Sequence, residues 1–171
     1  MGKKDMIAVQ PRSVAVCIAY TSSTPPSICL VSSRKHDSRW VLPKGGIESS
    51  DADEGTAALR ELWEEAGLQA QDGRSTWVGR GHADVVGDMK GHKHSPSKDP
   101  KAPTFVPRAV YTPVAVLVDP GLDAKDEWPE AHERERDFVP VEEALQRIEW
   151  REDIHELLRR WWEKRRQDES A

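Results

Sequence analysis

Residues 46–68 decide the fold of this chain and read GIESSDADEGTAALRELWEEAGL. Residues 53–66 favour a helix, and Gly67 is a suitable residue for the left-handed turn that ends one. At about 100° per residue, Glu61, Glu64 and Glu65 share one face of this helix. The opposite face is apolar and carries Leu59, Leu62, Trp63 and Ala66. The stretch therefore predicts a helix with one carboxylate face and one face for the core.

The carboxylate face favours a bound cation. Like charges at this spacing repel one another by a few tenths of a kcal/mol per pair, so a purely structural helix gains nothing from them. Mg²⁺ reverses that sign, because it prefers oxygen ligands and bridges carboxylates to substrate phosphates. Arg60 lies at the edge of the face, where its guanidinium can orient one glutamate by a bidentate contact. The alternative is a solvated acidic face with Arg60 as its counter-charge.

The spacing of these residues resembles the Nudix box of the Nudix hydrolase family. The matching fixed positions are Gly46, Arg60, Glu61, Leu62, Glu64, Glu65, Gly67 and Leu68. The early glutamate of the box is missing, since Ala52 stands at its position between Asp51 and Asp53. We interpret this departure as an acid shifted to a neighbouring position. We expect it to affect the entry to the helix more than the activity.

The resemblance implies an α/β protein: a Nudix-type α/β/α sandwich with a mixed β-sheet, a catalytic loop-helix-loop and a C-terminal helix. It implies Mg²⁺, for which Mn²⁺ can substitute, on Glu61, Glu64 and Glu65, and a water that attacks phosphorus. We expect Glu64 to act as the general base beside Arg60. Gly45 and Gly46 would let the backbone approach metal or phosphate without a Cβ in the way.

The rest of the chain predicts one domain over residues 11–168 after a tail at 1–10. Runs rich in β-branched residues predict strands at 13–20, 28–32, 40–42 and 138–141, the first two forming a hairpin. Further strands are expected over 74–86 and over 105–119, the latter broken or placed at an edge by Pro107 and Pro113. Helical character begins at 142–148 and resumes at about 152–166, with an apolar stripe that docks on the core. A polar segment at about 87–103 has no periodicity and predicts an insertion loop, a kind of loop that is usually functional or disordered.

The flanks of the box resemble diphosphoinositol polyphosphate phosphohydrolases, the fungal ones in particular. The resemblance rests on SSRKHDSRWVLPKGG at 32–46 and WPEAHERER at 128–136. It implies that Arg12, Ser33, Arg34 and Lys44 line a phosphate pocket. In the second stretch His132, Arg134 and Arg136 alternate with acids, so an extended segment would put all three bases on one face toward substrate.

Charge and composition limit the partners. The net charge is −5 and the pI about 5.7, with no aromatic-rich basic stripe, so we expect no nucleic acid partner. Apolar runs are too short to span a membrane, and two cysteines do not make a disulfide framework. We expect a monomer in the cytoplasm, with the nucleus also open, acting on a small polyanionic substrate. Residues 47–89 are net acidic and the segments before and after them net basic, which suits a metal site beside a polyanion.

The predicted activity is Mg²⁺-dependent hydrolysis of phosphoanhydride bonds in diphosphoinositol polyphosphates, together with diadenosine polyphosphates and inorganic polyphosphate. One alternative is a hydrolase of nucleoside-diphosphate-linked or dinucleoside polyphosphate substrates, in which adenine stacks on an aromatic side chain. A second is a catalytically silent module that binds nucleotide or RNA. The intact glutamate trio argues against the silent module, since a pure binder has no use for repelling carboxylates.

Overall fold

A computed structural model describes residues 9–70, 75–81 and 83–170, so most of the tail at 1–10 lies outside the described residues. In this part of the chain eight strands form one mixed sheet in the order β3-β2-β1-β7-β5, with β4 on β1, β6 on β7 and β8 on β2. The strands are β1 (Arg12–Tyr20), β2 (Ser27–Ser32), β3 (Trp40–Val41), β4 (Lys44–Gly46), β5 (Ser75–Val78), β6 (Val86–Gly87), β7 (Ala109–Leu117) and β8 (Arg136–Pro140). The helices are α1 (Glu54–Ala66), α2 (Pro120–Asp123), α3 (Val141–Arg147) and α4 (Glu152–Ser170).

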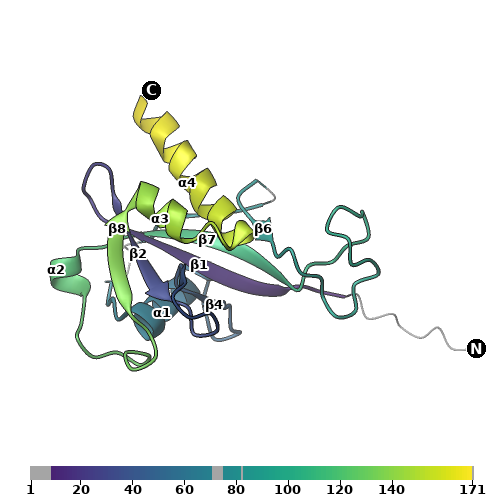
Figure 1. Ribbon diagram of the computed structural model, residues 1–171, viewed down its shortest axis with the longest axis horizontal. Helices are drawn as coiled ribbons and strands as arrows, with labels where there is room; N and C mark the ends of the chain where they lie inside the picture. Colours follow the sequence, from purple (N-terminus) through teal and green to yellow (C-terminus); the bar gives the residue numbers. More distant parts are fainter. Residues whose placement is uncertain (1–8, 71–74, 82, 171) are drawn as a thin grey trace, which may run out of the picture.

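Helices cover both faces of the sheet, which confirms the α/β/α sandwich. Figure 1 shows α1 on one side of β1 and β7, with α3 and α4 on the other. Alternate side chains of β1 point to opposite faces. Ala15 and Cys17 pack with α1, whereas Val16 and Ile18 pack with α4.

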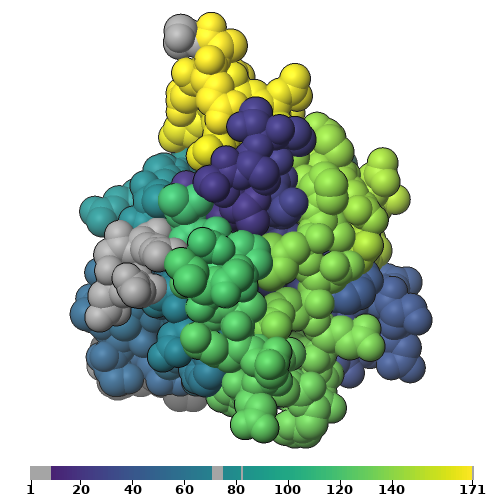
Figure 2. Space-filling view, turned by 90° about the vertical axis from the view of Figure 1, so that its left-hand side faces the viewer, coloured from purple at the N-terminus to yellow at the C-terminus, as the bar shows by residue number. Residues whose placement is uncertain are grey.

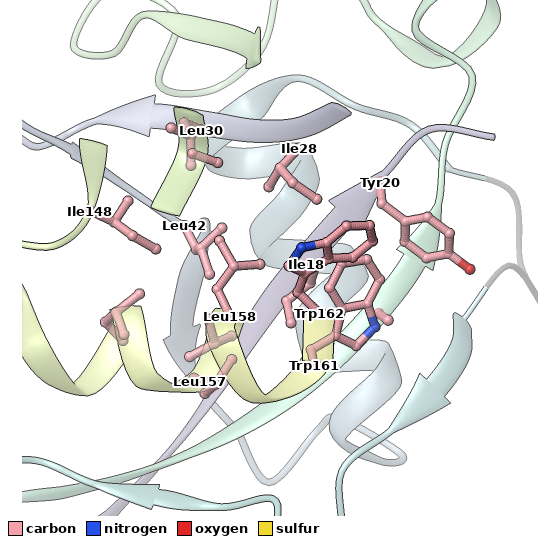
Figure 3. Packing of buried hydrophobic residues seen from close by; sticks show 14 of the residues in the cluster. Ile18, Tyr20, Ile28, Leu30, Leu42, Ile148, Leu157, Leu158, Trp161 and Trp162 are labelled. Atoms are coloured by element: carbon pink, nitrogen blue, oxygen red, sulfur yellow. The ribbon is translucent and has the colours of Figure 1, made fainter. Parts of the chain in front are cut away.

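The α4 side of the core is built from large side chains. Ile18 and Ile28 of the sheet meet Leu158, Trp161 and Trp162 of α4 (Figure 3). The predicted apolar stripe of the C-terminal helix therefore docks on the core as expected. The helix itself is longer than predicted and ends at Ser170, and its last residues stand clear of the body (Figure 2).

Both ends of α1 are fixed by identifiable residues: Asp53 at the start, which the sequence did not single out, and Gly67 at the end, as expected. The Asp53 carboxylate accepts a hydrogen bond from the Thr56 backbone N–H at 2.7 Å, a side-chain cap of the helix N-terminus. Gly67 ends the helix with φ 64°, a left-handed conformation that an L side chain rarely adopts. The helix entry is therefore intact although the early glutamate of the box is absent.

Strand β7 lies in the centre of the sheet, so the expected edge position is wrong. It pairs in parallel with β1 from Arg12 opposite Ala109 to Tyr20 opposite Leu117. On the other side of β7, β6 pairs with Val110 and Tyr111, and β5 pairs with residues 114–116. Pro113 lies between these two paired stretches of β7. The N–H that Pro113 lacks is thus not required by either neighbour, which is why proline is tolerated here.

The strands differ from expectation at two other places. Residues 44–46 form a further strand, β4, which was not expected and which pairs with Val14, Ala15 and Val16 of β1. The strand expected over 74–86 is two short strands, β5 and β6, separated at Gly79 and Gly81; Arg74 lies outside the described residues. The hairpin of β1 and β2 is confirmed, although the main partner of β2 is β8.

The insertion at 87–103 is anchored at its base. Gly87 belongs to β6, and Gly91 forms an isolated bridge with Pro107 on the returning chain. Figure 1 shows this segment extending from the sheet near the start of β1. No helix in the described ranges is both long and apolar enough to cross a membrane.

Candidate functional site

The three glutamates of α1 stand beside β4, but they differ in their surroundings. Glu61 and Glu65 are buried, whereas the Glu64 side chain is 39% exposed. Burial raises the pKa of Glu65 to about 7, against the opposing effect of the Arg134 charge. Burial also raises the pKa of Glu61, and the nearby Glu64 adds to this shift. Glu61 and Glu65 thus have raised pKa values and lie near Glu64. Three neighbouring carboxylates favour the binding of a cation at this face of α1.

Gly45 lets α1 and β4 approach closely. A Cβ added at Gly45 would lie 2.1 Å from the Glu61 carboxyl carbon, so the carboxylate occupies the space of the missing side chain. The backbone N–H of Lys44 donates to Glu65 Oε2 at 3.2 Å. The Gly45-Gly46 pair therefore sets the backbone directly against the acidic face, as the sequence predicted.

Arg60 connects the entry loop to the helix. Its Nη2 donates to Asp51 Oδ2 at 3.0 Å and its Nε to Asp51 Oδ1 at 3.3 Å. Its Nη1 donates to Glu61 Oε1 at 2.7 Å, and its Nη2 also reaches the Gly46 carbonyl at 3.1 Å. The bidentate contact that we expected with a glutamate is thus made with Asp51. Asp51 is the shifted acid, and it orients Arg60 from the position before Ala52.

Glu64 is the least constrained of the three glutamates. Its carboxylate makes no hydrogen bond to any residue that the structure describes, and its closest cation is Arg60 Nη1 at 3.7 Å. An exposed carboxylate without hydrogen bonds is available to accept a proton from water.

Arg134 makes contacts that the sequence did not suggest. Its buried guanidinium donates from Nη2 to Glu65 Oε1 at 3.0 Å, from Nε to Glu130 at 3.1 Å and from Nη1 to the Ser32 carbonyl at 2.9 Å. It therefore ties the acidic helix to the end of β2. Arg60 holds the Glu61 carboxylate and Arg134 holds the Glu65 carboxylate. Among the described residues, no three acidic, His or Cys side chains are grouped closely enough to hold a metal ion.

The predicted basic face of His132, Arg134 and Arg136 does not form. Residues 129–133 are turns rather than extended chain, so the alternation of bases and acids does not translate into faces. The His132 side chain is 75% exposed, whereas Arg134 is buried against Glu65. Arg136 donates to the carbonyls of Ala66, Gly67 and Lys125. Its charge thus stabilises the C-terminal end of α1, where Nη1 is engaged by these carbonyls.

Trp128 completes this end of the helix and was missed by the sequence reasoning. Its indole N–H donates to the Glu65 carbonyl at 3.1 Å, and the Arg136 guanidinium lies 4.6 Å from the ring centre. A Cβ on Gly67 would lie 2.6 Å from the same ring. The only sequence signal for Trp128 was the resemblance of residues 128–136 to diphosphoinositol polyphosphate phosphohydrolases. That resemblance does not indicate that Trp128 caps a helix.

A groove of about 530 Å³ opens at Arg134, the residue that contacts Glu65. One wall is the loop between β2 and β3, and the other is the 131–135 segment. Its lining residues are Ser32, Ser33, Asp37, Ser38, Arg39, Trp40, Ala131, His132, Glu133, Arg134 and Glu135. The groove thus brings together Ser33, His132 and Arg134 of the predicted substrate residues.

Arg34 stands beside this groove in contact with the opposite wall. Its Nη1 lies 3.0 Å from Glu133 Oε2 and 3.3 Å from Glu130 Oε1. The hydrogen bond from Arg34 holds the pKa of Glu133 below its usual range. Ser33 Oγ accepts from the His36 N–H at 3.3 Å, so its hydroxyl also closes the loop.

Arg12 and Lys44 lie on the other face of β4. Gly46 pairs with Val14 and Lys44 with Val16, and both valines belong to the core under α4. The Arg12 guanidinium lies over Gly46, where a Cβ would be 2.6 Å from its Nη2. Burial and the Arg151 charge lower the pKa of Lys44. The two cations are therefore separated from the glutamates by the thickness of β4.

The geometry defines a class of protein: an α/β sandwich in which helix α1 presents carboxylates to a glycine-rich strand. A family model described as "NUDIX domain" matches residues 10–161. The chain belongs to the Nudix family. Nudix hydrolases act on phosphoanhydrides and generally use a divalent metal ion, usually Mg²⁺.

Relatives and solved structures agree with this assignment. The human diphosphoinositol polyphosphate phosphohydrolase 3-alpha is 29% identical over 143 residues, which cover 82% of this chain and 71% of the relative. The mouse diphosphoinositol polyphosphate phosphohydrolase 2 is 27% identical over 143 residues, covering 82% and 65%. The NUDIX domain of Shewanella oneidensis NrtR complexed with ADP ribose has a TM-score of 0.59 at 16% identity, covering 95% and 93%. A C. elegans Ap4A hydrolase binary complex has a TM-score of 0.56 at 17% identity, covering 88% and 94%.

Proposed function

We propose that this protein hydrolyses the phosphoanhydride bond of a diphosphoinositol polyphosphate. The observation that carries the proposal is the groove lined by Ser33, Arg39, His132 and Arg134, with a volume of about 530 Å³, in which Arg134 also contacts Glu65. The similarity to human and mouse diphosphoinositol polyphosphate phosphohydrolases supports the same substrate class.

Glu61, Glu64 and Glu65 would hold the divalent ion. Their donor set is oxygen only, which suits a hard cation such as Mg²⁺ or Mn²⁺. Burial of Glu61 and Glu65 raises both pKa values, as expected for carboxylates that a cation would stabilise. When bound, the ion would offset negative charge on the phosphate oxygens as the bond breaks.

The remaining chemistry falls to side chains of this chain. Glu64 accepts a proton from the attacking water, whose oxygen bonds to phosphorus while the bridging P–O bond breaks. Arg60 keeps Glu61 in place through its contact at 2.7 Å. Gly45 and Gly46 keep the backbone next to the reacting phosphate.

The phosphates that do not react would be held by cations around the glutamates. Arg34 borders the groove at its Glu133 side, and Arg12 and Lys44 approach from the other face of β4. A ligand that meets both sets must reach around β4. Arg136 is not included, because its Nη1 donates to the carbonyls of Ala66, Gly67 and Lys125 at the end of α1.

A dinucleoside polyphosphate is the second candidate, and Trp40 favours it. Trp40 lines the groove and is half-buried, so one side of its ring can support a base. The Arg147 guanidinium lies 5.2 Å from the Trp40 ring centre. This contact leaves less of the ring for stacking and ranks the candidate second.

A substrate panel with purified protein tests the proposal. The panel is a diphosphoinositol pentakisphosphate, diadenosine hexaphosphate, inorganic polyphosphate and ADP-ribose, each with Mg²⁺, with Mn²⁺ and with excess chelator. We expect kcat/KM to be highest for the inositol substrate and all hydrolysis to stop in chelator. The variant Glu64→Gln should lower kcat by at least about a hundredfold while the protein stays folded.

Other outcomes reject defined parts of the proposal. A preference for diadenosine hexaphosphate would move the assignment to the second candidate. Hydrolysis in excess chelator would exclude the metal role of the glutamates. Binding without hydrolysis of any compound would leave the silent module as the better description.

A further inference from the structure

Arg39 is a cation of the groove without an acidic partner. Its side chain lines the groove, and its guanidinium forms no hydrogen bond or ion pair with the described part of the chain. The other arginines nearby are occupied, Arg34 by Glu133 and Arg134 by Glu65. Arg39 therefore reaches the groove with all five of its N–H donors unused.

Trp150 holds Arg39 in place. The guanidinium carbon of Arg39 lies 4.7 Å from the centre of the Trp150 ring. A guanidinium stacked on an aromatic ring keeps its in-plane N–H groups free for a second ligand. Trp150 comes from the connection between α3 and α4, a part of the chain distant in sequence from the acidic helix.

Trp150 also fixes the loop that carries Arg39. Its indole N–H donates to the Trp40 carbonyl at 3.0 Å, and the His36 ring meets it edge-on at 5.1 Å between ring centres. Within the loop, the Ser33 N–H donates to the Arg39 carbonyl at 2.8 Å. One half-buried tryptophan thus contacts the loop at three residues, which gives the groove wall a defined shape.

We propose that Arg39 is a specificity-determining phosphate contact of the groove and that Trp150 is its positioning residue. This inference rests on the proposed function, since it assigns one cation to the non-reacting phosphates of that substrate. A planar guanidinium donates two parallel N–H bonds to a phosphate, a geometry that lysine does not reproduce. Because stacking already orders the side chain, less conformational entropy is lost when phosphate binds.

The first experiment compares Arg39→Ala and Arg39→Lys with a matched control. Arg166→Ala is the control, because Arg166 also lies over a tryptophan, Trp162 at 5.9 Å, but on α4 away from the groove. We expect Arg39→Ala to raise KM for the inositol substrate about tenfold with kcat within about twofold. Arg39→Lys should give an intermediate KM, and Arg166→Ala should match wild type.

Binding of inositol hexakisphosphate, measured by calorimetry in chelator, supplies a readout that does not depend on catalysis. We expect Arg39→Ala to weaken it by the same factor as the change in KM. If wild type binds this probe but hydrolyses no phosphoanhydride, the proposed function fails and the role of Arg39 is still measured. Equal binding by Arg39→Ala and Arg166→Ala would overturn the assignment of Arg39.

The second experiment tests Trp150 with Trp150→Leu and Trp150→Phe, using Trp77→Leu as control. Trp77 is half-buried on β5 and lies under Lys164, away from the loop. Trp150→Leu should raise KM severalfold and speed trypsin cleavage at Arg34, Lys35 and Arg39, whereas Trp150→Phe should restore most of both. If the Leu variant does not fold, the Phe variant and Arg39→Ala carry the test. Cleavage and KM unchanged from wild type in both Trp150 variants would remove the positioning role.

Discussion

At the scale of single residues, Gly45, which has no side chain, is as important to the geometry of the site as the charged residues are. Glu61 reaches its place because Gly45 leaves room for the carboxylate, with 2.1 Å between the missing Cβ position and the carboxyl carbon. Non-bonded atoms do not come this close. Any larger residue at position 45 must therefore displace the backbone of β4 or the Glu61 side chain. The glycine is therefore part of the geometry of the site.

We predict that Gly45→Ala lowers kcat by at least about tenfold, because the displaced Glu61 loses its position beside the other glutamates. Steady-state kinetics with the best substrate of the panel measures the effect. Gly46→Ala is the matched comparison, since its Cβ would meet only the flexible guanidinium of Arg12. It should lower kcat less than Gly45→Ala does. Equal losses would mean that both glycines act through the backbone alone.

Asp51 takes the place of the missing acid of the box, and its effect on activity should pass through Arg60. We predict that Asp51→Asn lowers kcat several-fold, because a neutral amide cannot make the charge-assisted bidentate contact that orients Arg60. Asp53→Asn is a suitable control, since asparagine still caps the helix at that position. A kcat for Asp51→Asn equal to that of the control would show that Arg60 needs no acid here.

The sequence indicated the site unequally well. The helix face and its glutamates follow from spacing alone, because α-helix geometry fixes which residues neighbour one another. Arg39 and Trp150 could not be paired, since they meet only when the α3–α4 connection packs on the β2–β3 loop. Arg134 was predicted to face substrate, and its burial against Glu65 depends on a turn that the charge alternation concealed.

At the scale of elements, α1 is defined by its two ends. The C-terminal end combines a left-handed Gly67, the Trp128 indole and the Arg136 guanidinium. These groups satisfy carbonyls that the last turn of a helix leaves without intrahelical partners. Glu64 and Glu65 belong to that last turn, so the cap and the acidic face share the same residues.

We predict that Gly67→Ala lowers the free energy of unfolding by more than about 1 kcal/mol, from the left-handed backbone and the contact with Trp128. Chemical denaturation monitored by tryptophan fluorescence measures it. Gly81 also has positive φ, but no atom of the described residues lies within 4 Å of its missing Cβ. Gly81→Ala therefore isolates the backbone cost. A loss no larger than in Gly81→Ala would mean that the Trp128 ring moves freely aside.

The elements were predictable where local signals sufficed. Caps and apolar periodicity located α1 and α4, because these signals lie within the helices themselves. The central place of β7 was not predictable, since the effect of Pro113 depends on where β5 and β6 begin. For the same reason β4 was not expected: its glycines are explained by the approach of Glu61 and Arg12, not by strand propensity.

At the scale of the whole molecule, a buried carboxylate connects the insertion to the sheet and to α4. Asp88 accepts from the Tyr111 hydroxyl at 2.6 Å, from Arg108 Nε at 2.7 Å and from the Lys90 N–H at 2.8 Å. Arg151 at the start of α4 donates to the same tyrosine hydroxyl at 2.8 Å. Burial would raise the pKa of Asp88, but these hydrogen bonds together lower it.

We predict that Asp88→Asn lowers the free energy of unfolding by about 1–3 kcal/mol, because Arg108 loses its counter-charge and the tyrosine its charged acceptor. The effect should stay below that of a fully buried pair, since the Arg108 side chain is 46% exposed. Asp99→Asn is the control within the same insertion, where the carboxylate accepts only from the Lys101 N–H. Thermal and denaturant unfolding should give the same loss. An Asp88→Asn variant as stable as wild type would mean that Asp88 does not tie the insertion to the rest of the fold.

The parallel pairing of β1 with β7 also has a consequence for how the chain is made. β1 is synthesised first, but its nine-residue ladder partner begins only at Ala109. Until then the nascent chain carries an apolar strand with one open edge, the kind of surface that pairs with other chains. A ribosome that stops before residue 117 would thus release a product without the middle of its sheet. Such truncated products should depend on chaperones, whereas shortening after the body of α4 leaves the sheet complete.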